Sequence, residues 1–261
     1  MTRQQTITNM SICFDSIIDL CEGLDESQWA TQSLCPDWDV AAALAHLVAI
    51  EKALVDITEP GLDVPLDFAA IGETMKTLTA GPGADVLAEA KAVFAARADQ
   101  LAAVDDTFWD TPSWTPVGPQ TYGRFMAIRV FDLWVHEQDM RVPLGIPGHL
   151  DGPAAEMALD EVHRSLGYIM GKKVGLADGQ SAAIHVTGGA GADLFVAVDG
   201  RAAVVEELTN PTMSLTLDHQ AFLLLACGRV DPQSIIDEGR IERAGDIELA
   251  DRASRNLAFT M

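Results

Sequence analysis

Apolar residues recur every three or four positions through most of residues 9–142, which is the spacing of one face of an α-helix. Helices are predicted over residues 9–24, 37–54, 84–103 and 121–142, the last ending before Pro143 because proline disfavours helix at and before its own position. Residues 56–68 contain two prolines and a glycine and are predicted to form a loop. Four helices with apolar stripes, joined by partly long loops, predict a four-helix bundle.

The pattern changes in the second half of the chain. Turn-forming residues gather at 145–153 and predict a linker, and a further helix is predicted over 153–170. The apolar period then falls toward two, which predicts short strands at 183–186, 194–198, 202–206 and 213–216, with turns at 188–193 and 199–200. Two final helices are predicted, over 219–226, capped by Asp218, and over 247–257.

These patterns predict two domains. Residues 1–145 are expected to form the helical bundle, and residues 153–261 a small α+β domain with a mostly antiparallel sheet.

The acidic composition limits the partners that the chain is expected to bind. Lysine and arginine total 17 against 39 acidic residues, for a formal net charge of −22. Such a surface repels phosphate backbones and anionic lipids, so we expect neither nucleic acid nor a membrane as partner. The N-terminus lacks a secretory signal pattern, and a cytoplasmic location is expected.

The chain contains four cysteines, Cys13, Cys21, Cys35 and Cys227, without the spacing of a zinc site or a disulfide framework. Reduced thiols are therefore expected. Cys35, beside Pro36 at the entrance of a helix, is the one cysteine with a chance of exposure. Because no histidine lies near it in the sequence, we expect an unreactive thiol there rather than a catalytic one.

Two of the predicted helices carry ionisable residues among core residues. His46 is the one polar residue in AAALAHLVAI (41–50), and RFMAIRVFDLWVHEQD (124–139) carries Asp132 and, one turn later, His136. Two imidazoles and a carboxylate converging from two helices suit Zn²⁺, Fe²⁺ or Ni²⁺ and leave a coordination position open. The residues alone equally allow an Asp132–His136 ion pair and a core His46 bonded to a backbone carbonyl.

Other polar residues near these positions have two readings each. Arg129 is a candidate for holding a substrate carboxylate or cofactor, or for pairing with an acidic residue on a neighbouring helix. Asp139 is a candidate for orienting a ligand histidine, or for pairing with Arg141. Arg229 and Arg240, far along the chain, are weaker candidates for reaching the same site. The remaining histidines, His149, His163, His185 and His219, are expected to be structural or exposed.

Three stretches resemble the mycothiol-dependent maleylpyruvate isomerase family: CPDWDVAAALAHLVAIE (35–51), RVFDLWVHEQDMRVPLG (129–145) and CGRVDPQSIIDEGRIERAGDIELADR (227–252). The resemblance implies a DinB-like metal-binding bundle followed by a sterol-carrier-like domain. It implies a divalent metal, zinc foremost, held by His46, Asp132 and His136, which would act in catalysis through the metal. Asp132 falls where the family has a glutamate.

The resemblance also implies an activity. Mycothiol would form a thiolate on the metal, add to a cis double bond of a substrate such as maleylpyruvate, and leave after rotation. The alternatives are a mycothiol S-transferase acting on electrophiles and a non-catalytic small-ligand-binding protein. The expected partners are thus a small-molecule substrate and a low-molecular-weight thiol, with the protein a monomer or a weak homo-oligomer.

Overall fold

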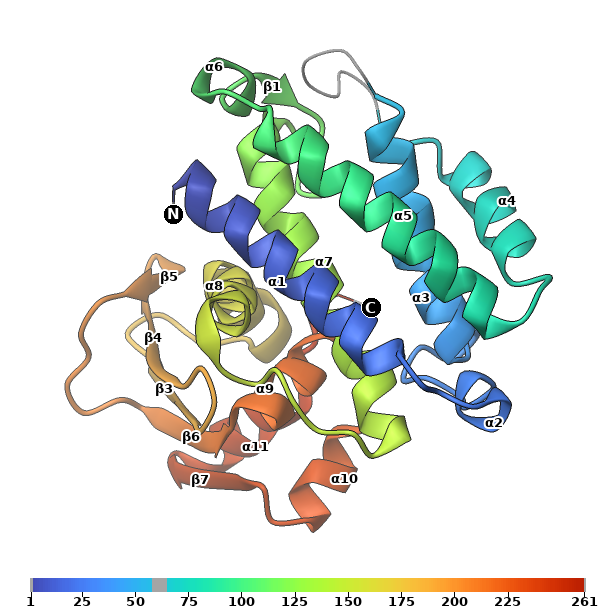
Figure 1. Ribbon diagram of the computed structural model, residues 1–261. Helices are drawn as coiled ribbons and strands as arrows, with labels where there is room; N and C mark the ends of the chain where they lie inside the picture. Colours follow the sequence, from blue (N-terminus) through green and yellow to red (C-terminus); the bar gives the residue numbers. More distant parts are fainter. Residues whose placement is uncertain (1, 58–64, 261) are drawn as a thin grey trace. The chain divides into compact units, whose positions relative to one another are not determined.

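The chain folds into a helical N-terminal unit and an α+β C-terminal unit (Figure 1). The computed structural model describes residues 2–57 and 65–260. The two compact units are Met1–Gly148 and His149–Met261. Within the described ranges, no helix has both the length and the apolar character needed to cross a bilayer.

Four long helices build the N-terminal unit: α1 (Arg3–Cys21), α3 (Val40–Val55), α5 (Gly83–Ala102) and α7 (Tyr122–Leu144). Helix α3 packs against α5 and α7, and α1 packs against the same two helices, so the four helices enclose one core. The predicted four-helix bundle is confirmed. Short elements complete the unit: α2 (Glu26–Trp29), α4 (Phe68–Leu78), α6 (Asp106–Trp109), β1 (Pro112–Ser113) and β2 (Gln120–Thr121).

The helix boundaries follow local capping chemistry. The side chain of Asp39 accepts a hydrogen bond from the backbone N–H of Ala42 at the start of α3, and Thr121 caps α7 in the same way. Helix α4 had no counterpart in the prediction, and Ile71 is its one buried residue. The loop predicted at 56–68 lies largely outside the described residues.

The end of α7 corrects one prediction. The helix does not stop before Pro143 but runs through it to Leu144, and Gly145 ends it in the left-handed conformation with φ 66°. Pro143 lacks an N–H, so it cannot donate the usual helical hydrogen bond to the carbonyl of Asp139, four residues earlier. That carbonyl instead accepts the backbone N–H of Leu34 at 3.0 Å. Through this hydrogen bond, the loop that contains Leu34 is attached to α7, although the two are far apart in the sequence.

The C-terminal unit contains a five-stranded sheet in the order β5-β4-β3-β6-β7. Its strands are β3 (Ser181–Thr187), β4 (Ala192–Asp199), β5 (Arg201–Val205), β6 (Met213–Asp218) and β7 (Ile241–Gly245). The β3–β6 pair is parallel and the other three pairs are antiparallel, which confirms the prediction of a mostly antiparallel sheet. The prediction missed β7, because this edge strand is mostly exposed and lacks alternating apolar residues.

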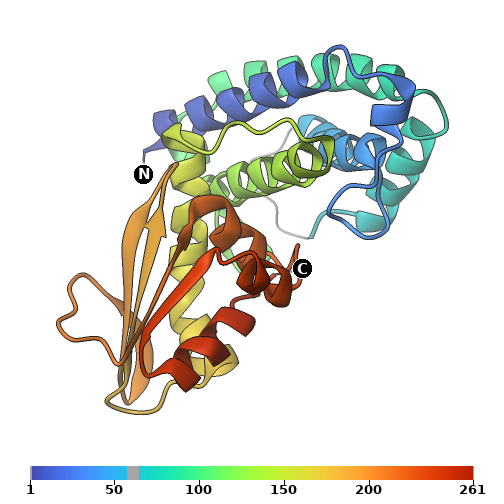
Figure 2. The ribbon, with the colours of Figure 1, turned by 90° about the horizontal axis from the view of Figure 1, so that it is seen from below.

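Helices cover one face of this sheet (Figure 2). They are α8 (Gly152–Tyr168), with a π-helical extension η1 (Ile169–Val174), α9 (His219–Ala226), α10 (Pro232–Asp237) and α11 (Ile247–Arg255). Helices α8, α9 and α11 contact the strands, and every second residue of β6, starting at Met213, is buried. This alternation is the two-residue period of a sheet with one buried face.

Candidate metal centre

The three residues selected from the sequence converge in the N-terminal unit. His46 comes from α3, and Asp132 and His136 come from α7. Nε2 of His46 lies 3.7 Å from Oδ2 of Asp132, and Nε2 of His136 lies 3.7 Å from Oδ1 of the same carboxylate. The two imidazole rings are 4.7 Å apart between centroids. The fold therefore brings both imidazoles against one carboxylate, each at a different oxygen.

This arrangement fits a divalent cation. Ligand atoms bound tetrahedrally at about 2.0–2.1 Å lie about 3.3 Å apart, so the observed separations of 3.7 Å require only a slight closure. All three potential ligand atoms lie within 4.8 Å of one another. The side chains of His46 and Asp132 keep 17% and 30% of their surface exposed, which leaves an approach for a further ligand.

The opposite edge of the His136 ring is held by a second carboxylate. Nδ1 of His136 lies 2.9 Å from Oδ2 of Asp139, which is fully buried. A carboxylate accepts this hydrogen bond, so Nδ1 carries the proton and Nε2 remains the nitrogen directed toward Asp132. A carboxylate in this position is the usual partner of a metal-ligating histidine. Of the two readings of Asp139, the structure shows the contact with His136, and Arg141 pairs with Glu137 instead.

The protonation states reflect the local charges. Burial by itself lowers the pKa of His136, but the charge of Asp132 and hydrogen bonds from the surroundings outweigh it and raise the pKa to about 10. Burial raises the pKa of Asp132, yet the Arg129 guanidinium and His136 hold it well below its usual range. Burial lowers the pKa of His46, so this imidazole is neutral at neutral pH. The site thus contains an ionised carboxylate that attracts positive charge.

A buried charge network anchors Asp132 from the other side. Arg129 donates to Oδ2 of Asp132 at 2.6 Å and to Glu51 at 2.9 Å, and Arg97 donates to the second oxygen of Glu51 at 2.9 Å. Arg129 is 3% exposed, and both Glu51 and Arg97 are fully buried. Of its two readings, Arg129 therefore shows the pairing with neighbouring acidic residues; a role in binding substrate or cofactor stays a prediction.

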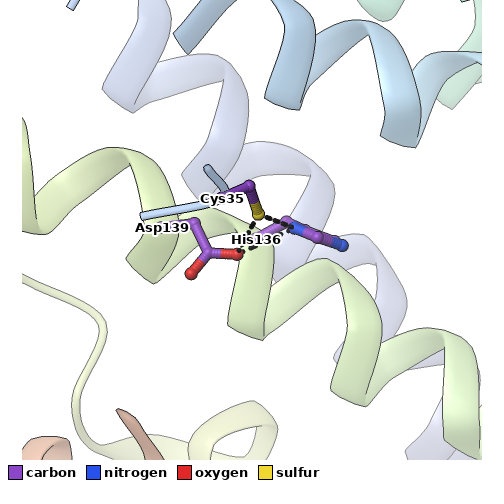
Figure 3. Close-up of side chains that lie close together, drawn as sticks. All are labelled: Cys35, His136 and Asp139. Atoms are coloured by element: carbon purple, nitrogen blue, oxygen red, sulfur yellow. Dashed lines mark hydrogen bonds and ion pairs between the residues drawn. The ribbon is translucent and has the colours of Figure 1, made fainter. Parts of the chain in front are cut away.

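The sequence analysis did not place Trp38 and Cys35 beside the candidate centre. The ring of Trp38 lies 4.7 Å from that of His46 and 5.7 Å from that of His136, and packs beside both. Cys35 is 8% exposed, so its expected exposure is wrong. Its sulfur lies 3.2 Å from Oδ2 of Asp139 and 3.7 Å from Nδ1 of His136 (Figure 3). These partners are more than 100 positions away in the sequence, so only the tryptophan next to the His46 helix gave a local signal.

The remaining candidates lie in the C-terminal unit. Arg229 donates to the carbonyl of Cys227, and Arg240 binds Asp218 through two nitrogens at 2.7 and 2.8 Å. A role for either arginine at the candidate centre stays a prediction. Of the histidines expected to be structural or exposed, His219 is buried, and that burial lowers its pKa to about 4.

The fold and the site together describe a helical bundle with a partly buried cluster of two imidazoles and a carboxylate, followed by an α+β domain. Two family models match this chain: the mycothiol maleylpyruvate isomerase N-terminal domain over residues 11–141 and the corresponding C-terminal domain over residues 156–252. The chain therefore belongs to the mycothiol-dependent maleylpyruvate isomerase family.

Solved structures agree with this assignment at the level of the fold. The crystal structure of a substituted mycothiol-dependent maleylpyruvate isomerase aligns with a TM-score of 0.64 and 12% identity, covering 94% of this chain and 93% of that chain. A second crystal structure of the mycothiol-dependent maleylpyruvate isomerase aligns with a TM-score of 0.62 and 13% identity, covering 88% and 90%. No curated protein matches the sequence.

Proposed function

We propose that this protein is a metal- and mycothiol-dependent enzyme that isomerises a cis double bond in a small substrate of the maleylpyruvate type. The observation that carries the proposal is the convergence of His46, Asp132 and His136, with the potential ligand atoms within 4.8 Å of one another. Membership of the family supports the choice of thiol and reaction class. The same reasoning assigns residues 1–145 as the metal-binding domain and residues 153–261 as a sterol-carrier-like domain.

The metal and the thiol would supply the reactive sulfur: when both are bound, the thiol is acidified and acts as a nucleophile that adds to the double bond and leaves again after rotation. The residues of the chain prepare this chemistry. His46 offers a neutral nitrogen, His136 would offer Nε2 once its proton is displaced, and Asp132 offers negative charge toward a divalent cation. Arg129 holds Asp132 in place, because its Nη1 hydrogen bond of 2.6 Å fixes the carboxylate against rotation.

The geometry of the ligands also leaves room for the thiol. Three protein ligands would leave at least one coordination position open, and the partial exposure of His46 and Asp132 supports an approach from solvent. Trp38, half-buried beside both imidazoles, shields their faces from water. A sulfur entering between them would meet a partly dry environment, which strengthens its attraction to the cation.

The proposal is tested on purified protein by elemental analysis and by cobalt substitution. We expect one divalent metal per chain, and we expect mycothiol to perturb the cobalt absorption spectrum. The variant His46→Ala should lose both metal and activity, whereas His185→Ala, a change on β3 in the C-terminal unit, should keep both. A metal-free wild type, or a His46→Ala variant with unchanged metal and activity, would refute the proposal.

An activity screen with maleylpyruvate and with a thiol-reactive electrophile separates the reaction classes. Isomerisation of maleylpyruvate is the expected result. Turnover of the electrophile alone would identify an S-transferase, which needs the same ligands and the same thiol. Thiol-independent binding of a small ligand without turnover would identify a non-catalytic binding protein.

A further inference from the structure

The loop formed by residues 33–39 is fastened to α7 beside the candidate centre. The backbone N–H of Leu34 donates to the carbonyl of Asp139, to which Pro143 cannot donate a helical hydrogen bond. Within the loop, Ser33 Oγ accepts from the N–H of Cys35 and donates to the carbonyl of Trp38. The loop is thus held rigidly at the same residue, Asp139, whose side chain binds His136.

The Cys35 thiol points from this loop toward the Asp139–His136 pair (Figure 3). Its sulfur lies 3.2 Å from Oδ2 of Asp139, the same oxygen that accepts from Nδ1 of His136. Both Cys35 and Asp139 are buried, so water does not readily compete for these contacts. One carboxylate oxygen therefore receives two donors, an imidazole N–H and a thiol S–H.

The distances favour hydrogen bonding over metal binding at this second cluster. Cys35, His136 and Asp139 are of the right types to hold an ion. However, the 2.9 Å between Nδ1 and Oδ2 is shorter than the roughly 3.3 Å expected between two ligands of a tetrahedral ion. A metal on Nε2 would in addition lie across the ring from the sulfur, out of reach of Cys35.

We propose that Cys35 is a positioning residue of the candidate centre. Its thiol donates to Asp139 and holds this carboxylate in the orientation that keeps Nδ1 of His136 bonded and Nε2 directed at Asp132 and His46. The inference rests on the proposed function for its consequence, metal affinity, but the hydrogen bond itself exists with or without a metal. Without the thiol, a buried carboxylate oxygen would lose one of its donors and be free to rotate away from the ring.

The first test measures cobalt binding by Cys35→Ala, Cys35→Ser and Cys21→Ala. Second-sphere partners of metal-ligating histidines commonly change affinity 10- to 100-fold. Cys35 acts on His136 through Asp139 and is therefore one hydrogen bond further from the metal. We expect Cys35→Ala to weaken cobalt binding roughly three- to tenfold and to shift the ligand-field bands. Cys35→Ser should restore both, because a hydroxyl donates to the same oxygen. Unchanged affinity and spectrum in Cys35→Ala would overturn the proposal.

Cys21→Ala is the matched control. Cys21 is also buried in the N-terminal unit, but its pKa responds to burial, Glu137 and Arg141 rather than to the candidate centre. The loss of a buried sulfur there should lower stability without changing the cobalt spectrum. If Cys21→Ala and Cys35→Ala shift the spectrum equally, the effect is general loosening of the core and the proposal fails.

A second test separates this inference from the proposed function. Nitrogen-15 NMR of labelled histidine in the metal-free protein should show a downfield Nδ1 proton on His136, and Cys35→Ala should shift it and speed its exchange. This signal is expected even if the wild type binds no metal, in which case only the proposed function fails. A cobalt protein that shows an intense thiolate charge-transfer band, lost in Cys35→Ala, would make Cys35 a ligand and refute the positioning role.

Discussion

Helix α7 carries two pairs of ionisable residues with the same spacing and different contacts, one buried and one partly exposed. Glu137 and Arg141, four residues apart, are joined at 2.6 Å, and Ser16 donates to the same Glu137 oxygen at 2.6 Å. Asp132 and His136, also four residues apart, approach only to 3.7 Å, with His46 at the same distance from the carboxylate. The first pair closes into hydrogen bonds, whereas the second leaves a gap of the size that a cation fills.

This comparison shows what spacing alone does not reveal. The same i, i+4 spacing serves an ion pair and a pair of metal ligands, because a buried charge without a partner is unfavourable in either case. The distinction comes from the neighbours of each pair. Glu137 is bonded by Arg141 and Ser16, whereas Asp132, besides its bond from Arg129, meets two imidazoles whose nitrogens also bind metals. A structural pair and a candidate ligand pair thus lie within one turn of each other.

The largest expected effect comes from removing a ligand. His136→Ala should weaken divalent-metal binding by roughly a thousandfold, since one of three protein ligands carries about a third of a zinc site's binding free energy. Metal content after dialysis, measured by elemental analysis, tests this expectation. If the variant retains stoichiometric metal, His136 is not a ligand and has a structural role like that of Glu137.

Breaking the Glu137–Arg141 pair should lower stability and leave metal binding unchanged. Glu137→Ala leaves the Arg141 guanidinium, only 10% exposed, without its carboxylate and should reduce the free energy of unfolding by about 3–5 kcal/mol. Denaturant unfolding measures the loss. Metal content per folded chain should remain that of the wild type, because Glu137 accepts hydrogen bonds from Ser16 and Arg141. Loss of metal without loss of stability would reverse the assignment of the two pairs.

The sequence predicted the candidate metal ligands but not the residues that hold them in place. The helical period placed His46, Asp132 and His136 on inward helix faces, and the fold brings them together. The same period did not reveal the partners Glu51, Arg97 and Cys35, because these contacts depend on how distant helices and loops pack. The contact between Leu34 and the Asp139 carbonyl was not predicted either, since the two residues are far apart in the sequence and α7 was expected to end before Pro143.

A third prediction concerns pH. In the metal-free protein the pKa of His136, raised to about 10 mainly by Asp132 against the opposing effect of burial, keeps this ring protonated at neutral pH. A metal must displace that proton, so its apparent affinity should rise roughly tenfold per pH unit between about pH 7 and about pH 9 and level off near the pKa. Competition with a chelator of known affinity at each pH measures the slope.

The same raised pKa affects the stability of the metal-free protein with a defined sign. Relative to the ordinary value of 6.5, the protonated ring stabilises the fold fully at low pH, and this contribution is lost as pH rises toward about 10. Metal affinity and metal-free stability should therefore change in opposite directions with pH. A pH-independent affinity would show that His136 is not a ligand.

The smallest expected effect is that of Asp132→Glu, which introduces the residue that the family resemblance places at this position. The longer arm adds one methylene and must share its space with the Nη1 contact from Arg129, now 2.6 Å from Asp132. Because the carboxylate is kept, metal affinity should change less than about tenfold, whereas Asp132→Ala should lose metal as His136→Ala does. Cobalt binding by the two variants measures the difference. If Asp132→Glu and Asp132→Ala lose metal equally, the length of the aspartate side chain, held by Arg129, is as necessary for metal binding as its charge. The centre would then be too rigid to accommodate one added methylene.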